Sequence, residues 1–174
     1  MPISITVKVT GLPQARAMVK RVVDIANDKD AASFKALNKV ADVFDKNFAS
    51  EGSDVGGWAD LAERTVRDRE AQGFGGEHPI LIRYGDLRRI AATSLKTVKR
   101  ETRLSASDAR GSTINVAVKV TDGRMEVVGT GEKAMNQIPG QNRPARPFWY
   151  VNNNVENAAR DGVVDYIADE LRRL

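Results

Sequence analysis

One segment constrains the fold more than any other, because its apolar residues recur with the period of an α-helix. Between residues 34 and 48 the steps from one apolar position to the next alternate between three and four residues. Such spacing places these residues on one stripe of a helix, and three phenylalanines on a single stripe indicate a buried face rather than a ligand box. We predict a helix, capped at its start by Asp30 or Ser33. Its buried stripe consists of Phe34, Leu37, Ala41, Phe44 and Phe48.

Helical spacing and helix-breaking residues predict four further helices. Pro13 suits the first turn of a helix that starts at Leu12, and Asp60 followed by Glu63 predicts the capped start of a peripheral helix. The last helix has apolar residues on one side, namely Val155, Ala159, Val163, Tyr166, Ile167, Leu171 and Leu174. The predicted ranges are a helix from Leu12 to about 26, a helix at about 60–72, a short helix from Asp86, and a terminal helix at about 153–173, with a Gly-rich loop at 50–57.

Alternation of apolar and polar residues predicts strands. The pattern is clear at 3–9 and 112–121, present at 124–130, and weak at 95–104. Asp122-Gly123 is a strong hairpin turn between two of these strands. Helices followed by an antiparallel sheet and a closing helix predict an α+β fold in a single domain over 1–174, whose length is sufficient to bury roughly 70% of the unfolded surface.

Composition argues against enzymatic chemistry. The chain has no cysteine and one histidine, His78, so thiolate catalysis, most zinc sites and Ser-His schemes lack their residues. Gly129-x-Gly131-x-x-Ala134 superficially matches a dinucleotide fingerprint, but no parallel βαβ unit surrounds it. The acids Asp165, Asp169 and Glu170 fit a solvated helix face. We predict a protein that is not an enzyme and needs no cofactor or metal.

Charge and hydropathy suggest where the chain works. The 27 basic and 23 acidic residues give a net charge of +4, which favours a mixed, solvated surface over a dedicated DNA-binding one. The N-terminal residues lack the apolar core of a signal peptide, and no window reaches the ~18 apolar residues of a membrane helix. We expect synthesis in the cytoplasm and no membrane partner.

The segment at 138–152 combines stiff backbone with cationic and aromatic side chains. Pro144 and Pro147 favour extended backbone at the residues before them, Arg143 and Arg146, so the segment loses little entropy when it docks. Phe148, Trp149 and Tyr150 follow directly. Three interpretations are open for this arm: a plug in the chain's own core, a platform for stacking unpaired bases, and an anchor for a neighbouring protein. For Phe148 and Trp149 core burial is as good an interpretation as anchoring, whereas the two arginines favour a contact between subunits.

An ordered set of short motifs resembles the phage virion morphogenesis family of tail completion proteins. These motifs are "FASEG" followed by a Gly-rich loop and Trp, "LIRYGDL", a strand that ends in "VVGTG", and "RPARPF" before the last helix. The resemblance covers about residues 40–155 and leaves out 1–30 and the far C-terminus. "KAMNQIPGQ" lacks a tyrosine and a histidine of the family, and Arg83-Tyr84 stands where Arg/Lys-Thr is more usual. The matching residues are Phe48, Glu51, Gly52, Trp58, Leu61, Thr65, Arg69, Leu81, Gly85, Leu87, Gly129, Thr130, Pro144, Ala145, Arg146, Pro147 and Phe148.

The resemblance implies a structural protein of a tailed-phage virion, located in the neck or at the head-proximal end of the tail. It would be a subunit of a ring, six-fold like the tail tube, and would contact the tail tube or terminator and head-closure or connector proteins, with possible non-specific DNA contact in the lumen. A nucleic-acid-binding accessory protein is the alternative, and a metal-dependent nuclease ranks third. The residues predicted to build the interface or the arm are Trp58, Arg83, Gly85, Arg88, Arg143, Pro144, Arg146, Pro147, Phe148 and Trp149.

Overall fold

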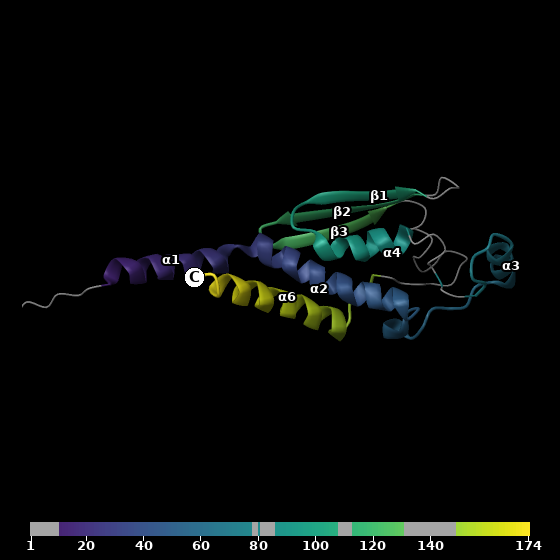
Figure 1. Ribbon diagram of the computed structural model, residues 1–174, viewed down its shortest axis with the longest axis horizontal. Helices are drawn as coiled ribbons and strands as arrows, with labels where there is room; N and C mark the ends of the chain where they lie inside the picture. The colour runs from purple at the N-terminus through teal and green to yellow at the C-terminus, as the bar shows by residue number, and fades with distance from the viewer. Residues whose placement is uncertain (1–10, 78–79, 81–85, 108–112, 131–148) are drawn as a thin grey trace, which may run out of the picture.

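The computed structural model describes residues 11–77, 80, 86–107, 113–130 and 149–174. The predicted strand at 3–9, the whole of "LIRYG" and most of the 138–152 segment lie outside these residues. Two long helices, a small sheet and a C-terminal helix give the predicted α+β fold (Figure 1). The elements are α1 (Leu12–Asn27), α2 (Lys29–Ala49), η1 (Ser53–Val55), α3 (Glu63–Ala71), α4 (Asp86–Ala91), η2 (Thr93–Thr97), β1 (Thr102–Ser107), β2 (Thr113–Thr121), β3 (Arg124–Thr130) and α6 (Asn153–Leu171).

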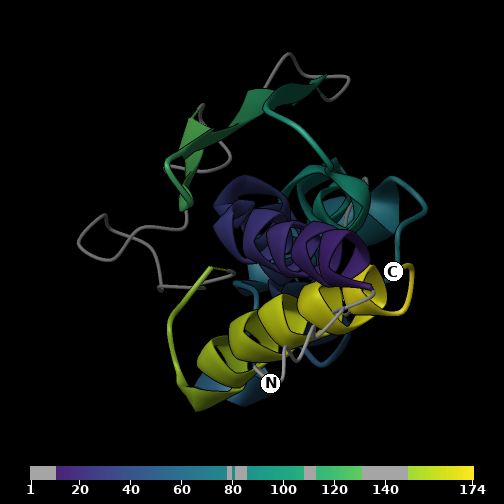
Figure 2. The same cartoon turned by 90° about the vertical axis from the view of Figure 1, so that its left-hand side faces the viewer.

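Helix α2 is the centre of the protein, and the predicted stripe is its core face. All five residues of that stripe are buried, and Ala41 and Phe48 are fully so. The sheet and α4 lie on one side of α2, and α6 lies on the other side (Figure 2). The apolar stripe of a single helix therefore organises the rest of the core.

The residue that caps the start of α2 is not one of the two predicted residues. Asp28 is the N-cap, and its carboxylate accepts a hydrogen bond from the backbone N–H of Ala31 at 3.1 Å. Asp30 and Ser33, the predicted caps, instead hold the β2–β3 turn. The Asp30 carboxylate accepts from the N–H of Gly123 at 2.8 Å, and the Ser33 hydroxyl donates to the Gly123 carbonyl at 2.7 Å. Both side chains are thus used in tertiary contacts.

The sheet is antiparallel with the order β1-β2-β3. The predicted hairpin is confirmed, since Thr121 pairs with Arg124 and both turn residues, Asp122 and Gly123, have positive φ, as a type I′ turn requires. The weak strand predicted at 95–104 is wrong for its first half, where η2 forms. The Asn38 side chain donates to the carbonyls of Leu95 and Val98 at 2.9 and 3.0 Å, so tertiary hydrogen bonds hold this stretch.

Helix α3 lies at the far end of the molecule and is mostly exposed, as predicted for a peripheral helix (Figure 1). Its predicted cap is wrong. The backbone is still extended at Ala62, which is the N-cap and makes no capping hydrogen bond through its side chain. The helix therefore starts too late for Asp60 to cap it. Arg69, one of the residues that match the family, is the buried residue of this helix.

Helix α6 packs along α2 through only part of the apolar side that the sequence pattern predicted. Val155 and Gly162 are its buried residues, whereas Val163, Ile167 and Leu171 of the predicted apolar side are 36%, 39% and 43% exposed. A Cβ atom on Gly162 would lie 2.5 Å from the Cα of Ala36. The two backbones thus approach closely at the glycine, and this approach turns the valine-rich side outward.

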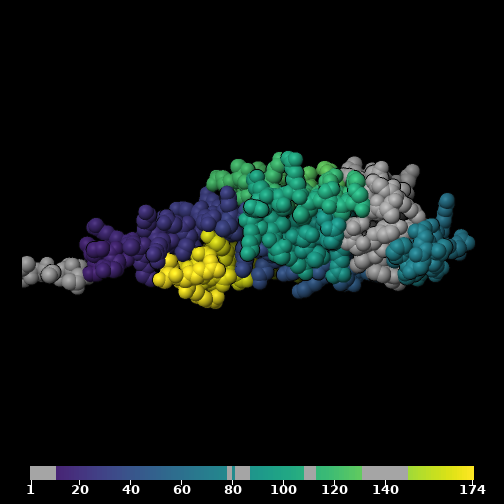
Figure 3. All heavy atoms as spheres, turned by 45° about the horizontal axis from the view of Figure 1, so that its top comes forward, coloured from purple at the N-terminus to yellow at the C-terminus, as the bar shows by residue number. Residues whose placement is uncertain are grey.

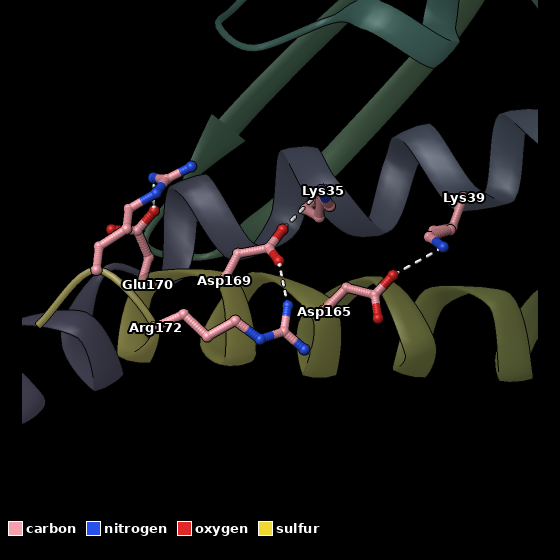
Figure 4. Close-up of polar contacts among 7 residues, drawn as sticks. Lys35, Lys39, Asp165, Asp169, Glu170 and Arg172 are labelled. Atoms are coloured by element: carbon pink, nitrogen blue, oxygen red, sulfur yellow. Dashed lines mark hydrogen bonds and ion pairs between the residues drawn. The ribbon is translucent and has the colours of Figure 1, made fainter.

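The sequence predicted that the acids of α6 face solvent. Two of them instead form ion pairs with lysines of α2. Asp165 forms an ion pair with Lys39 of α2 at 2.7 Å, and Asp169 forms one with Lys35 at 3.3 Å (Figure 4). These side chains remain about half exposed, so each pair adds little to the stability of the fold. Their role is to align α6 on α2. Among the described residues, no helix is long and apolar enough to cross a membrane.

Candidate interaction site at the root of the arm

Three of the predicted site residues, Trp58, Arg88 and Trp149, belong to the described part of the chain. The other seven lie outside it: Arg83, Gly85, Arg143, Pro144, Arg146, Pro147 and Phe148. The candidate site is therefore the root of the arm, which we define as residues 149–154, together with the surface of α2, α4 and the Gly-rich loop that holds it.

Trp149 attaches the root to α4. Its indole is half-buried, and its Nε1–H donates a hydrogen bond to the carbonyl of Ala91 at 2.8 Å. Ala91 is the last residue of α4, and a carbonyl at a helix end has no intrahelical partner of its own. Trp149 thus satisfies a helix terminus of its own subunit, in agreement with the interpretation that places this side chain at the core.

Tyr150 attaches the root to α2 and to the Gly-rich loop. Its ring meets that of Phe44 edge to face, with 5.5 Å between the centroids, and its hydroxyl donates to the Asp54 carboxylate at 2.9 Å. Burial and the nearby Asp54 carboxylate raise the pKa of Tyr150. The phenol therefore stays protonated and remains a hydrogen-bond donor at any physiological pH.

Asp54 accepts hydrogen bonds from several side chains of the root. The Asn154 amide donates to the Asp54 carboxylate at 3.2 Å, and the Asn152 amide donates to the Asp54 backbone carbonyl at 3.4 Å. Asn152 is also the N-cap of α6, since its oxygen accepts from the N–H of Val155 at 3.1 Å. We call Asp54, Tyr150, Asn152 and Asn154 the Asp54 clamp. Sequence reasoning missed the clamp, although asparagines directly before a helix are a capping signal.

Trp58 belongs to a second cluster on the next turn of the α2 stripe. Its ring meets that of Phe48 edge to face, with centroids 5.5 Å apart, and its backbone N–H donates to the carbonyl of Glu51 at 2.8 Å. Glu51 in turn accepts from the N–H of Ile80 at 2.8 Å, while Gly52 lies against the indole. The structure thus brings together Phe48, Glu51, Gly52 and Trp58, four of the residues on which the family resemblance rests.

Arg88 lies in a charged cluster that joins three elements. The Arg88 Nε–H donates to the Asp45 carboxylate at 2.5 Å, and the Lys96 ammonium donates to the second oxygen of Asp45 at 2.7 Å. The hydrogen bond from Arg88 is the main cause that lowers the pKa of Asp45 from 3.8 to about 2. Arg88 is therefore engaged within its own subunit, and the cluster fixes α4 and η2 on α2.

We expect the Asp45 cluster to make stability depend on pH in acid. A carboxylate with a lowered folded-state pKa stabilises the fold above its unfolded pKa and loses this effect as pH falls through the folded pKa. At 1.36 kcal/mol per pKa unit, a shift from 3.8 to about 2 corresponds to roughly 2 kcal/mol. Denaturant unfolding of wild type and Asp45→Asn should therefore differ by about that amount at pH 6, and the difference should vanish toward pH 2. A difference that is constant over this range would contradict the assignment.

The hollow beside the Asp54 clamp is open and is lined mainly by polar residues. It has a volume of about 340 Å³ and is lined by Val43, Lys46, Asn47, Ser50, Ser53, Asp54 and Asn154. Asn47 is almost fully buried, and neither polar atom of its amide has a hydrogen-bond partner among the residues that the structure describes. Among the described residues no three His, Cys, Asp or Glu side chains come together in a way that could hold a metal ion. The described site consists of contacts that hold segments in place.

Comparison with known proteins gives no match: no family model, no curated protein and no solved structure is significantly similar to this chain. The family resemblance thus depends on the ordered motifs of the sequence alone.

Proposed function

We propose that this chain is a structural protein of a tailed-phage virion. It completes the head-proximal end of the tail and joins it to the head or neck as one subunit of a ring, six-fold like the tail tube. Its partners are further copies of itself, the tail tube or terminator, and head-closure or connector proteins. The proposal extends the motif resemblance, and the observation that supports it most is the attachment of the root of the arm.

The root is held at two points that are independent of each other. Trp149 is bonded to the end of α4, and Tyr150 is bonded to Asp54 and packed on Phe44. A segment that leaves such a fixed point, with two prolines in "RPARP", has few conformations to lose when it docks on a neighbour. Arg143 and Arg146 are arginines, a residue type that is enriched among the hot-spot residues that contribute most of the binding energy of an interface.

Two of the described basic residues near the root, Arg88 and Lys96, do not favour the nucleic-acid alternative. Arg88 and Lys96 are neutralised by Asp45, and Lys96 also pairs with Asp42 at 3.1 Å. A groove that binds nucleic acid needs basic side chains that are available to phosphates. These contacts therefore support structural assembly rather than nucleic-acid binding.

The test compares two charge-matched double variants in a phage that depends on this gene. Arg143→Ala/Arg146→Ala removes the guanidinium groups of the arm, whereas Arg100→Ala/Arg103→Ala removes two exposed ones beside the sheet. We expect the arm variant to yield at least about thirty-fold fewer infectious particles, as the loss of a contact worth 2 kcal/mol implies. Electron microscopy should then show tails that are not joined to heads, and the control should assemble normally.

Three outcomes would overturn the proposal. The first is normal assembly of the arm variant with an unchanged melting temperature. The second is absence of the chain from purified particles, where labelled protein should appear as a ring at the head–tail junction. The third is retention on DNA that falls steeply with salt and is lost in the arm variant, without any effect on particles.

A further inference from the structure

Helix α1 extends beyond the body of the protein, and no element of the described chain covers its apolar face (Figures 1 and 3). None of its 16 residues is buried. Its apolar side chains are among the most exposed in the described chain: Leu12 47%, Met18 58%, Val19 63%, Val22 41% and Val23 50%. An isolated helix of this length is only marginally stable in water, and helices of folded proteins gain most of their stability by burying an apolar face. The apolar face of α1 therefore lacks the contact that would stabilise it.

A second exposed apolar surface lies on α6, on the side that faces away from α2. We call it the α6 strip, and it consists of Val163, Val164, Ile167, Leu171 and Leu174. The strip meets the C-terminal end of α1 at an open hollow of about 280 Å³, whose lining includes Ile25, Ala26, Val163 and Ile167. The two surfaces are thus adjacent within one subunit but do not cover each other.

The charges of the two helices are opposite in sign. Helix α1 carries three basic residues and one acidic residue, a net charge of +2, whereas residues 153–174, which cover α6 and the whole strip, carry three basic and five acidic residues, a net charge of −2. Asp165, Asp169 and Glu170 are paired within the subunit, with Lys39, Lys35 and Arg173. The charged side chains that stay exposed include Arg16, Lys20 and Arg21 on α1 and Glu156 and Asp161 on α6. Complementary potentials of this kind favour contact between the two surfaces and set its orientation.

We propose that α1 of one copy of this chain packs its apolar face on the α6 strip of a second copy. At 1.5 Å per residue the apolar face of α1, from Leu12 to Ala26, is about 21 Å long, and the strip from Val163 to Leu174 is about 17 Å long. The contact is head-to-tail because each copy offers a different surface to each neighbour, and contacts of this type form a ring when the rotation between neighbours closes. The inference rests on the proposed function in one respect, namely that copies of this chain assemble with one another.

A lipid surface is the other occupant that an exposed amphipathic helix suggests, and two observations disfavour it. Interfacial helices usually carry Trp, Phe or Leu on the apolar side, whereas α1 has no aromatic residue and a single leucine, at its first position. In addition, the acidic α6 lies beside α1 and would be repelled by anionic headgroups.

The test uses the purified full chain and three single variants that introduce the same charge. Val19→Glu places a carboxylate on the apolar face of α1, and Val164→Glu places one on the α6 strip. Ala17→Glu is the matched control, because at 100° per residue Ala17 lies on the opposite side of α1. All four chains should melt at similar temperatures, since each substituted side chain is exposed. Sedimentation velocity and light scattering over a concentration series measure self-association.

We expect wild type and Ala17→Glu to self-associate alike. Val19→Glu and Val164→Glu should each weaken association by at least about ten-fold, the effect of losing 1.4 kcal/mol of apolar contact. An equimolar mixture of these two variants should recover a one-to-one complex, because Val164→Glu retains an intact α1 and Val19→Glu retains an intact strip. A symmetric α1–α1 contact would not be recovered in the mixture.

Any of four results would overturn the inference: a wild type that stays monomeric, a Val164→Glu variant that associates like wild type, a mixture that fails to pair, or a monomer that binds phosphatidylglycerol vesicles through α1. The proposed function is tested separately in particles. Normal virions with Val19→Glu would refute the proposed α1 contact but not the proposed virion role. Pairing through α1 in a chain that is absent from particles would refute the virion role but not the α1 contact.

Discussion

Replacing Gly52 by alanine should lower the free energy of unfolding by about 3 kcal/mol, the sum of left-handed backbone strain and overpacking. Gly52 has φ +85°, and a Cβ atom built on it would lie 2.3 Å from Cδ1 of Trp58. The indole cannot move away freely, because it is buried and packs against Phe48. For a domain of this size the melting temperature should fall by about 9 °C, measurable by circular dichroism.

Gly56→Ala is the matched control for this prediction. Gly56 has φ +87° and belongs to the same loop, but apart from its own atoms and those of its chain neighbours no described atom lies within 4 Å of the position of its Cβ. Its replacement therefore adds the backbone strain without the clash and should cost about 1 kcal/mol. Equal melting temperatures of the two variants would show that contact with Trp58 does not restrict residue 52.

Gly162→Ala should also destabilise the protein, although alanine is the better helix former by about 1 kcal/mol. The added Cβ would lie 2.5 Å from the Cα of Ala36 and 2.8 Å from the carbonyl oxygen of Lys35. These are backbone atoms, so the whole of α6 must shift away from α2. Overpacking of up to about 3 kcal/mol then outweighs the helix propensity, and we expect a net loss of about 2 kcal/mol in denaturant unfolding.

Asn157→Ala provides the comparison on the same helix. Asn157 is exposed, so alanine at this position improves helix propensity without meeting α2. This variant should be as stable as wild type or slightly more stable. A Gly162→Ala protein that shares this gain would mean that α6 does not approach α2 as closely as Gly162 allows.

The root of the arm shows how far sequence reasoning reaches at the candidate site. Aromatic and Arg-Pro composition was sufficient to single out 138–152, and "FASEG" with Trp58 was sufficient to single out the cluster on Phe48. Composition gave no indication that Asp54, in a loop almost a hundred residues earlier, would hold Tyr150 and Asn154. Partners so distant in sequence leave no periodic signal, because hydrogen bonds between loops depend on how the helices beneath them pack.

Periodicity determined the α2 stripe, and alternation together with the Asp122-Gly123 turn determined the β2–β3 hairpin, because both follow from the local geometry of the backbone. Tertiary structure determined which stripe of α6 faces inward. Val155 and Gly162 lie on the buried side of the helix, whereas Val163, Ile167 and Leu171, which the sequence pattern also placed on the apolar side, lie away from it. Close contact between two helix backbones requires a residue without a side chain, so the glycine side packs on α2 and leaves the apolar strip exposed.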